Sequence, residues 1–161
     1  MEKLDAHRSH PRWGYVFETT YTLCRALELK ANLGQKTRAA YQSGDKKAVA
    51  ALIPVYEEVS KRIRAFYEAF RTQWFRENKP FGFEVQDIRL GGLMNRVEHC
   101  TYRLTQYVNG EIEKIDELEE KLLDYTGNGE NYVVNDHMSK DYKYMITPNV
   151  LVEPNAVFSC L

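Results

Sequence analysis

The sequence predicts an all-α fold, a bundle of three long helices followed by a C-terminal tail that is irregular or forms a short β-hairpin. Apolar residues recur every three or four positions over most of residues 15–125, which is the period of one face of a helix. Two clusters of turn-forming residues, at 43–44 and 78–82, interrupt this pattern and divide it into three segments. We therefore expect a linker at 1–14, the bundle at 15–125 and the tail at 126–161.

The first predicted helix spans residues 15–41 and ends at Gly44, since glycine readily adopts the left-handed conformation that closes a helix. Its predicted apolar stripe comprises Phe17, Tyr21, Cys24, Leu27, Ala31, Thr37 and Tyr41. The second helix is predicted to follow an Asp45 N-cap and to end at 78–82. Its predicted inward stripe comprises Val49, Leu52, Tyr56, Val59, Ile63, Phe66, Phe70 and Trp74. Pro54 removes a backbone donor, so we expect a kink at 50–54 or a helix start near the proline.

The third helix is predicted to begin between Phe83 and Asp87 and to continue to Tyr125. Asn109-Gly110 offers an alternative end. We favour continuity because the apolar phase carries across this pair, and a glycine inside a helix costs only about 1 kcal/mol relative to alanine. Gly91-Gly92 lies in the same segment, and we expect it to admit a close neighbour such as the ring of Trp74, Phe81 or Phe83.

The tail differs in character from the bundle. Gly127 and Gly129 flank a flexible joint, and short β-prone runs follow at 132–134, 142–146 and 150–152. A small hairpin and an extended tail are both open at this point.

Composition and charge exclude several classes of protein. The chain is 43% hydrophobic and 28% charged, which is ordinary for a globular domain. Its formal net charge of -1 provides no basic surface for nucleic acid. It has no apolar run long enough to cross a membrane and no signal-peptide core, so we expect no membrane association and a cytoplasmic location.

The cysteines and histidines give no support for a metal or cofactor site. Cys24, Cys100 and Cys160 are widely spaced and are predicted to be reduced thiols. The four histidines form no HExxH motif, and no CxxC pair is present. We predict no metal, no cofactor and no catalytic residue in this chain.

Several stretches go beyond generic helical patterning. They are 29–34, Arg38-Ala39-Ala40-Tyr41, Trp74-Phe75, 81–93 and 111–122. Together these stretches resemble the C-terminal α-helical domain of bacterial β-N-acetylhexosaminidases of glycoside hydrolase family 20, over about residues 13–125.

The resemblance implies that a catalytic (β/α)8 barrel precedes this domain in a parent enzyme that removes terminal N-acetylhexosamine. In that family an adjacent Asp-Glu pair on the barrel acts together with the acetamido group of the substrate. The one Asp-Glu step here, Asp116-Glu117, lies in a predicted helical run, and we carry over no catalytic residue. The implied partners are the catalytic barrel and, as a further hypothesis, a second copy in a homodimer.

Candidate interface residues come from two sets. Arg89 and Arg96 lie on roughly one helix face near Asp87 and Glu98, where two arginines could bind a carboxylate. The favoured alternative is that Asp87 stabilises the helix start and the arginines pair with acids on the second helix. Among the eleven tyrosines, we name as possible interface residues Tyr102, Tyr107 and Tyr132.

The sequence therefore favours a non-catalytic domain that packs on the barrel of its parent glycosidase. A stand-alone carbohydrate-binding or protein-interaction module is the alternative. A free-standing acid–base enzyme is a third hypothesis, and it requires acidic side chains facing inward between the helices.

Overall fold

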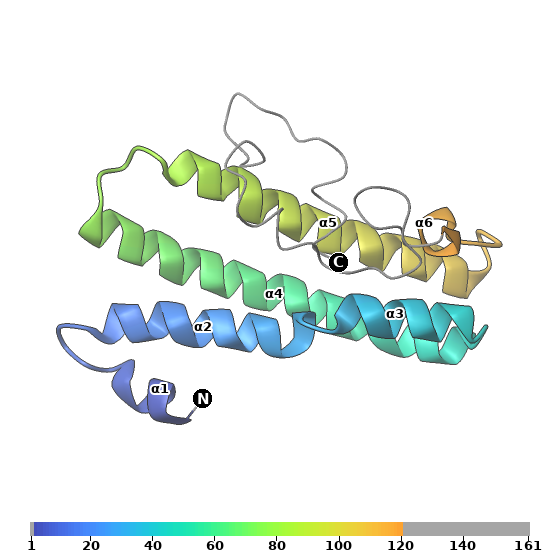
Figure 1. The fold of residues 1–161 in the computed structure, drawn as a ribbon, viewed down its shortest axis with the longest axis horizontal. Coiled ribbons are helices and arrows are strands. Elements are labelled where there is room, and N and C mark those ends of the chain that lie inside the picture. Colours follow the sequence, from blue (N-terminus) through green and yellow to red (C-terminus); the bar gives the residue numbers. More distant parts are fainter. Residues whose placement is uncertain (1, 121–161) are drawn as a thin grey trace, which may run out of the picture.

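The computed structural model describes residues 2–120, and these residues contain helices and no strand (Figure 1). The long helices are α2 (Gly14–Lys30), α4 (Lys46–Glu77) and α5 (Phe83–Asn109). The short ones are α1 (Glu2–His7), α3 (Leu33–Gln42) and α6 (Asp116–Glu119). The all-α class with three long helices is confirmed, whereas the predicted hairpin lies outside the described residues. No helix within 2–120 has the length and apolar character needed to cross a membrane.

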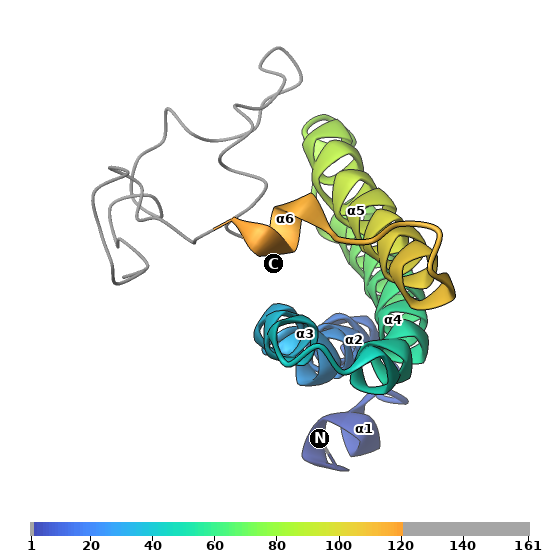
Figure 2. The ribbon, with the colours of Figure 1, turned by 90° about the vertical axis from the view of Figure 1, so that its right-hand side faces the viewer.

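Helix α4 is the central element of the domain. Helices α2 and α3 pack against it along one side and α5 along another, as the two perpendicular views show (Figure 1, Figure 2). The short α6 lies near α3 at one end of the bundle (Figure 2). The buried residues of α4, which we call the central stripe, are Val49, Tyr56, Val59 and Ile63. They belong to the predicted inward stripe, so that part of the prediction is confirmed.

The start and the end of α4 follow from local sequence. The Asp45 carboxylate accepts hydrogen bonds from the backbone N–H groups of Lys47, at 2.8 Å, and Ala48, at 3.2 Å. It therefore satisfies two donors that have no partner inside the helix, as predicted. The helix begins at Lys46 and continues through Pro54, so a start near the proline is wrong. It ends at Glu77, directly before the predicted turn.

Residues 15–41 form two helices rather than one. The chain leaves helical geometry at Asn32, which has a φ of -120° and occupies the N-cap position of α3 without a side-chain capping hydrogen bond. The buried face also changes phase at this break. Leu27, predicted to point inward, is 46% exposed. Thr37 and Tyr41 of the predicted stripe are buried on α3, together with Leu33. The buried positions on α2 are Gly14, Thr22 and Ala26, which were not in the stripe.

The predicted continuation of the third helix to Tyr125 is also wrong. Helix α5 ends at Asn109, and Gly110 adopts a φ of 76°. The N–H of Glu111 donates to the carbonyl of Gln106 at 2.9 Å, which satisfies a carbonyl at the helix end. The chain then turns, and Ile115 becomes buried at 3% exposure. Burying this side chain and completing the cap outweigh the small gain from extending the helix through glycine.

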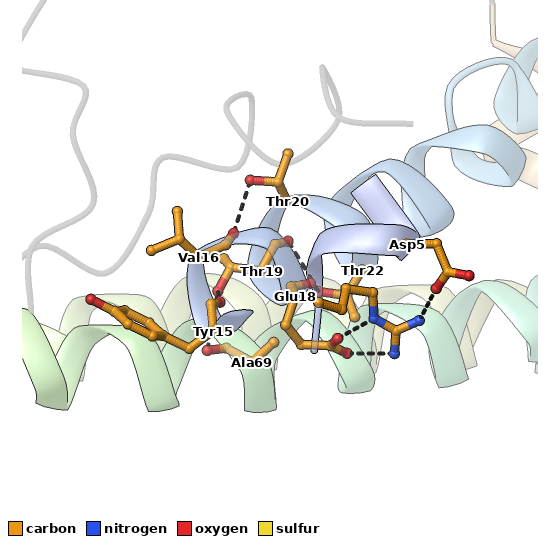
Figure 3. A network of polar contacts seen from close by, with 9 residues as sticks. Asp5, Tyr15, Val16, Glu18, Thr19, Thr20, Thr22 and Ala69 are labelled. Carbon is orange, nitrogen blue, oxygen red and sulfur yellow. Dashed lines mark hydrogen bonds and ion pairs between the residues drawn. The ribbon is translucent and has the colours of Figure 1, made fainter. Parts of the chain in front are cut away.

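The segment predicted as a linker, 1–14, contains helix α1, which packs on α2. Arg8 forms an ion pair with Asp5 at 2.6 Å and another with Glu18 of α2 (Figure 3). The two segments approach closely, because a Cβ atom added at Gly14 would lie 2.2 Å from the carbonyl oxygen of Arg8. Only glycine fits there without a shift of the backbone.

The expected close neighbour of Gly91-Gly92 is not found, because a Cβ at either position meets no atom within 4 Å.

Gly92, inside α5, and Gly110, at its end, offer a matched pair of substitutions. Gly92→Ala should stabilise the chain by about 0.5–1 kcal/mol, since alanine has the better helix propensity. Gly110→Ala should destabilise it by about 1–2 kcal/mol, because alanine is strained at positive φ. Urea unfolding followed by circular dichroism measures both. Equal effects of the two substitutions would contradict the helix end at Gly110.

Candidate interaction surface

The core of the described domain is apolar. Within residues 2–120, the buried polar or charged side chains are Thr22 and Thr37. The Thr37 hydroxyl donates to the carbonyl of Leu33 at 2.8 Å and lies 2.8 Å from the Tyr56 hydroxyl. Burial raises the pKa of Tyr56 to about 12, so this phenol is neutral at physiological pH. No carboxylate lies inside this part of the molecule.

A hollow on the surface between α2 and α4 does carry two carboxylates, those of Glu18 and Glu68. The Glu18 carboxylate is held by Arg8 through hydrogen bonds from Nε and from Nη2, the latter at 3.2 Å (Figure 3). Glu68 is exposed to solvent. One acid is paired with an arginine and the other is solvated, so neither lies in the apolar surroundings that are typical of a carboxylic general acid.

The described thiols are free. Cys24 and Cys100 are not joined by a disulfide, and burial raises the pKa of the Cys100 thiol. Cys160 lies outside the described residues. Within 2–120, no group of three or more His, Cys, Asp or Glu residues is placed to hold a metal ion.

The polar cluster predicted on the third helix connects α5 to its neighbours. Tyr67 of α4 donates to the Asp87 carboxylate at 2.7 Å, and Ser60 of α4 donates to Glu98 at 3.3 Å. The acids of the cluster therefore bind α4. Arg96 is half-buried, and its positive charge contributes to lowering the pKa of the Glu117 carboxyl on α6. Arg89 is also half-buried on α5.

The three tyrosines named as candidates differ in their positions. Tyr102 is 58% exposed, and its hydroxyl accepts a hydrogen bond from Gln106 at 2.8 Å. Tyr107, expected at the surface, is instead buried at 8% exposure, with its ring 5.1 Å from the ring of Tyr41. It belongs to the core because Tyr41 of α3 and Lys46 of α4, whose Nζ lies 4.9 Å from the ring centroid, both lie against it. Tyr132 lies outside the described residues.

Sequence analysis did not anticipate how the 111–120 segment is held on α3. Arg38 donates to the carbonyl of Leu118 at 3.0 Å, of Glu120 at 3.1 Å and of Glu117 at 3.3 Å. These carbonyls lie at the end of α6, where a cation also interacts favourably with the helix dipole. Arg38 thus clamps one end of the segment. The signal was present, since Arg38 and Tyr41 belong to one of the stretches that carry the family resemblance.

Tyr41 holds the other end of the same segment. Its hydroxyl accepts a hydrogen bond from the backbone N–H of Ile115 at 3.1 Å and donates one to the Glu119 carboxylate. On the α5 side, Arg103 pairs with Glu117 at 3.3 Å. The pKa of the Glu117 carboxyl is lowered chiefly by a hydrogen bond from the backbone N–H of Glu117 itself, and Arg103 lowers it further. The segment therefore joins α3 to α5.

Large exposed apolar side chains occur at one end of the bundle. Phe81 is 84% exposed in the turn between α4 and α5, and Phe75, in the last turn of α4, is 53% exposed. Trp13, directly before α2, is 45% exposed. Tyr15 of α2 donates to Glu77 of α4 at 2.9 Å, which places the start of α2 beside the end of α4. We call Trp13, Phe75 and Phe81 the aromatic end.

The fold and its surface thus define a helical domain with an apolar core and an exposed aromatic end, without a buried catalytic constellation in the described residues. The chain belongs to the family of glycoside hydrolase 20C C-terminal domains, whose family model matches residues 1–136. This confirms the family to which the sequence motifs pointed. A comparison with curated proteins gives no match.

The clamp on the 111–120 segment can be tested with Arg38→Ala. Loss of three hydrogen bonds from a charged donor should let the segment open locally. We expect the amides of Leu118 and Glu119 to exchange with deuterium at least about tenfold faster, while exchange in α4 stays unchanged. Lys36→Ala, an exposed change on the same helix, is the control. Unaltered exchange in Arg38→Ala would show that the clamp does not hold the segment.

Proposed function

We propose that this chain is the non-catalytic C-terminal domain of a β-N-acetylhexosaminidase, which packs on the catalytic barrel of its parent enzyme and helps to hold a homodimer together. Family membership supports the parent class. The observation that carries the non-catalytic role is the core: its buried polar side chains in the described residues are two threonines. The apolar side chains between the helices are thus used for packing, and none of the described carboxylates is buried among them.

The adjacent Asp116-Glu117 pair supports the same conclusion. Asp116 is at the surface and pairs with Lys114 at 3.0 Å, while Glu117 pairs with Arg103 at 3.3 Å. Each carboxylate therefore has its own cation. This arrangement stabilises α6 and does not match the use of such a pair in catalysis, which requires both groups to face one substrate.

A cytoplasmic location is part of this proposal. The free thiols of Cys24 and Cys100 support it, because reduced cysteines are usual in that compartment.

The experiment uses the parent enzyme with a protease site inserted before Met1. The proposal predicts that the intact enzyme cleaves a chromogenic N-acetylglucosaminide, that the 161-residue chain alone does not, and that both pieces still elute together from a sizing column after cleavage. Light scattering of the intact enzyme gives the mass and tests the homodimer. Hydrolysis by the chain alone would overturn the non-catalytic role, and separation of the pieces would overturn the packing role.

A further inference from the structure

We propose that the aromatic end, Trp13, Phe75 and Phe81, is the surface that docks on the catalytic domain, and that it binds an acidic face with an apolar centre. This inference rests on the proposed function and adds the place and the chemistry of the contact. Figure 1 shows that the turn between α4 and α5 and the start of α2 lie at the same end of the molecule, opposite α6. The aromatic end is therefore one terminus of an elongated domain.

The exposed ring of Phe81 is carried by a turn that is well fixed. The indole N–H of Trp74 donates to the carbonyl of Lys79 at 2.9 Å, and the Glu84 carboxylate accepts from the N–H of Gly82 at 2.7 Å. Gly82 has a φ of 96°, and a Cβ there would contact the Trp74 ring at 3.4 Å. Phe81 is thus held out toward solvent on an ordered backbone. A backbone that is already ordered loses little entropy on binding, which favours affinity.

The exposed ring of Phe75 packs against a buried aromatic ring. Its ring centroid lies 5.5 Å from that of Phe83, which is buried at 4% exposure. Phe83 also contacts the ring of Trp74 at 5.7 Å and that of Phe70 at 5.9 Å. The aromatic end therefore rests on a packed cluster of rings rather than on a loose loop. Aromatic residues in such settings are enriched among the residues that dominate protein–protein binding.

The charges at this end are mainly positive and indicate the chemistry of the partner. Arg12, Arg71, Arg76 and Lys79 are exposed there. The guanidinium of Arg76 lies 4.7 Å from the Tyr15 ring, and that of Arg12 lies 4.9 Å from the Trp13 ring. Two exposed carboxylates lie at the same end: Glu77 accepts from Tyr15 at 2.9 Å and from Gln73 at 3.1 Å, and Glu84 accepts from the N–H of Gly82. These donors are uncharged and leave both negative charges in place, but the cations outnumber them. An acidic partner surface would be complementary to the excess of cations.

The side-chain types favour a protein over a carbohydrate as the occupant. The rings of Phe75 and Phe81 could stack on the apolar face of a sugar, but they have no hydrogen-bonding group with which to select its hydroxyls. Aromatic rings together with arginine are instead the composition that is enriched in protein interfaces.

A second copy of the chain is a weaker candidate for the same surface. The opposite end of the bundle is rich in acids, since the 111–120 segment contains Glu111, Glu113, Asp116, Glu117, Glu119 and Glu120. Two copies would then join head to tail. Such contacts continue into rings or open filaments rather than closing as a twofold dimer. A different domain of the same enzyme, present at equal copy number, avoids this outcome.

The test uses the parent enzyme cleaved before Met1, as described above, with substitutions at the aromatic end. Phe81→Asp and Arg76→Glu should each weaken the association of the two pieces by at least about tenfold, measured by titration of one piece with the other. Leu27→Asp and Lys47→Glu are the matched controls, since both positions are exposed and lie away from this end. Unchanged melting temperatures of the 161-residue chain would show that the variants fold.

Each outcome has a distinct meaning. Loss of association in Phe81→Asp and Arg76→Glu, with both controls unchanged, supports the proposal. Association that is equal in all variants would overturn it and leave the packing role intact, because another surface would then hold the pieces. Pieces that separate even without a substitution would overturn the packing role in the proposed function, and this inference with it. A concentration-dependent increase in the mass of the 161-residue chain, abolished by Phe81→Asp, would assign the surface to a second copy.

Discussion

The structure depends on one constraint: α4 must bury apolar side chains on two sides at once. Its central stripe contacts α2 and α3 on one flank and α5 on another, so the other long helices are joined chiefly through it. Val49 and Val59 have no exposed surface. Burial of such side chains contributes about 25 cal/mol per Å² of apolar area removed from water. A helix in this position has little room for polar side chains on its inner faces.

This constraint determines how α2 meets α4. The buried residues of α2 are small, and Thr19 donates a hydrogen bond from its side chain to the backbone carbonyl of Ala69 at 3.3 Å. Arg62 likewise donates to the backbone carbonyl of Arg25 at 2.8 Å. Two helices linked in this way lie close together. The larger residues Leu23 and Leu27 are left at the surface, with 37% and 46% exposure. The same packing moves the acids outward, which supports the proposed non-catalytic role.

The regular part of this architecture could be predicted from the sequence, because local chemistry and long-range packing agree there. Asp45 is a strong N-cap wherever a helix follows, and the spacing of Val49 to Ile63 determines the inward face of α4. The predictions at Leu27 and Gly110 failed for a shared reason. In both places the apolar period continued along the sequence past the end of a helix, α2 at Lys30 and α5 at Asn109. Periodicity does not record the position of the helix that covers a stripe, and only the fold shows that Ile115 packs back on the bundle.

The candidate surface could be predicted only in part. Arg38 and Tyr41 lay in a stretch that carried the family resemblance, but their role requires a partner segment more than seventy residues later in the chain. The exposure of Phe81 could not be predicted either, because a phenylalanine between proline and glycine is as compatible with a covered turn as with an open one. Tyr107 shows the opposite error, since its ring was expected at the surface and packs against Tyr41 and Lys46.

The role of the central stripe can be measured most directly by comparing two truncations of aliphatic side chains. Ile63 is 2% exposed on α4, whereas Leu27 is 46% exposed on α2. If α4 holds the domain together, Ile63→Ala should lower the free energy of unfolding by about 2–5 kcal/mol, and Leu27→Ala by no more than about 0.5 kcal/mol. Equal losses, or a larger loss for Leu27→Ala, would contradict the account.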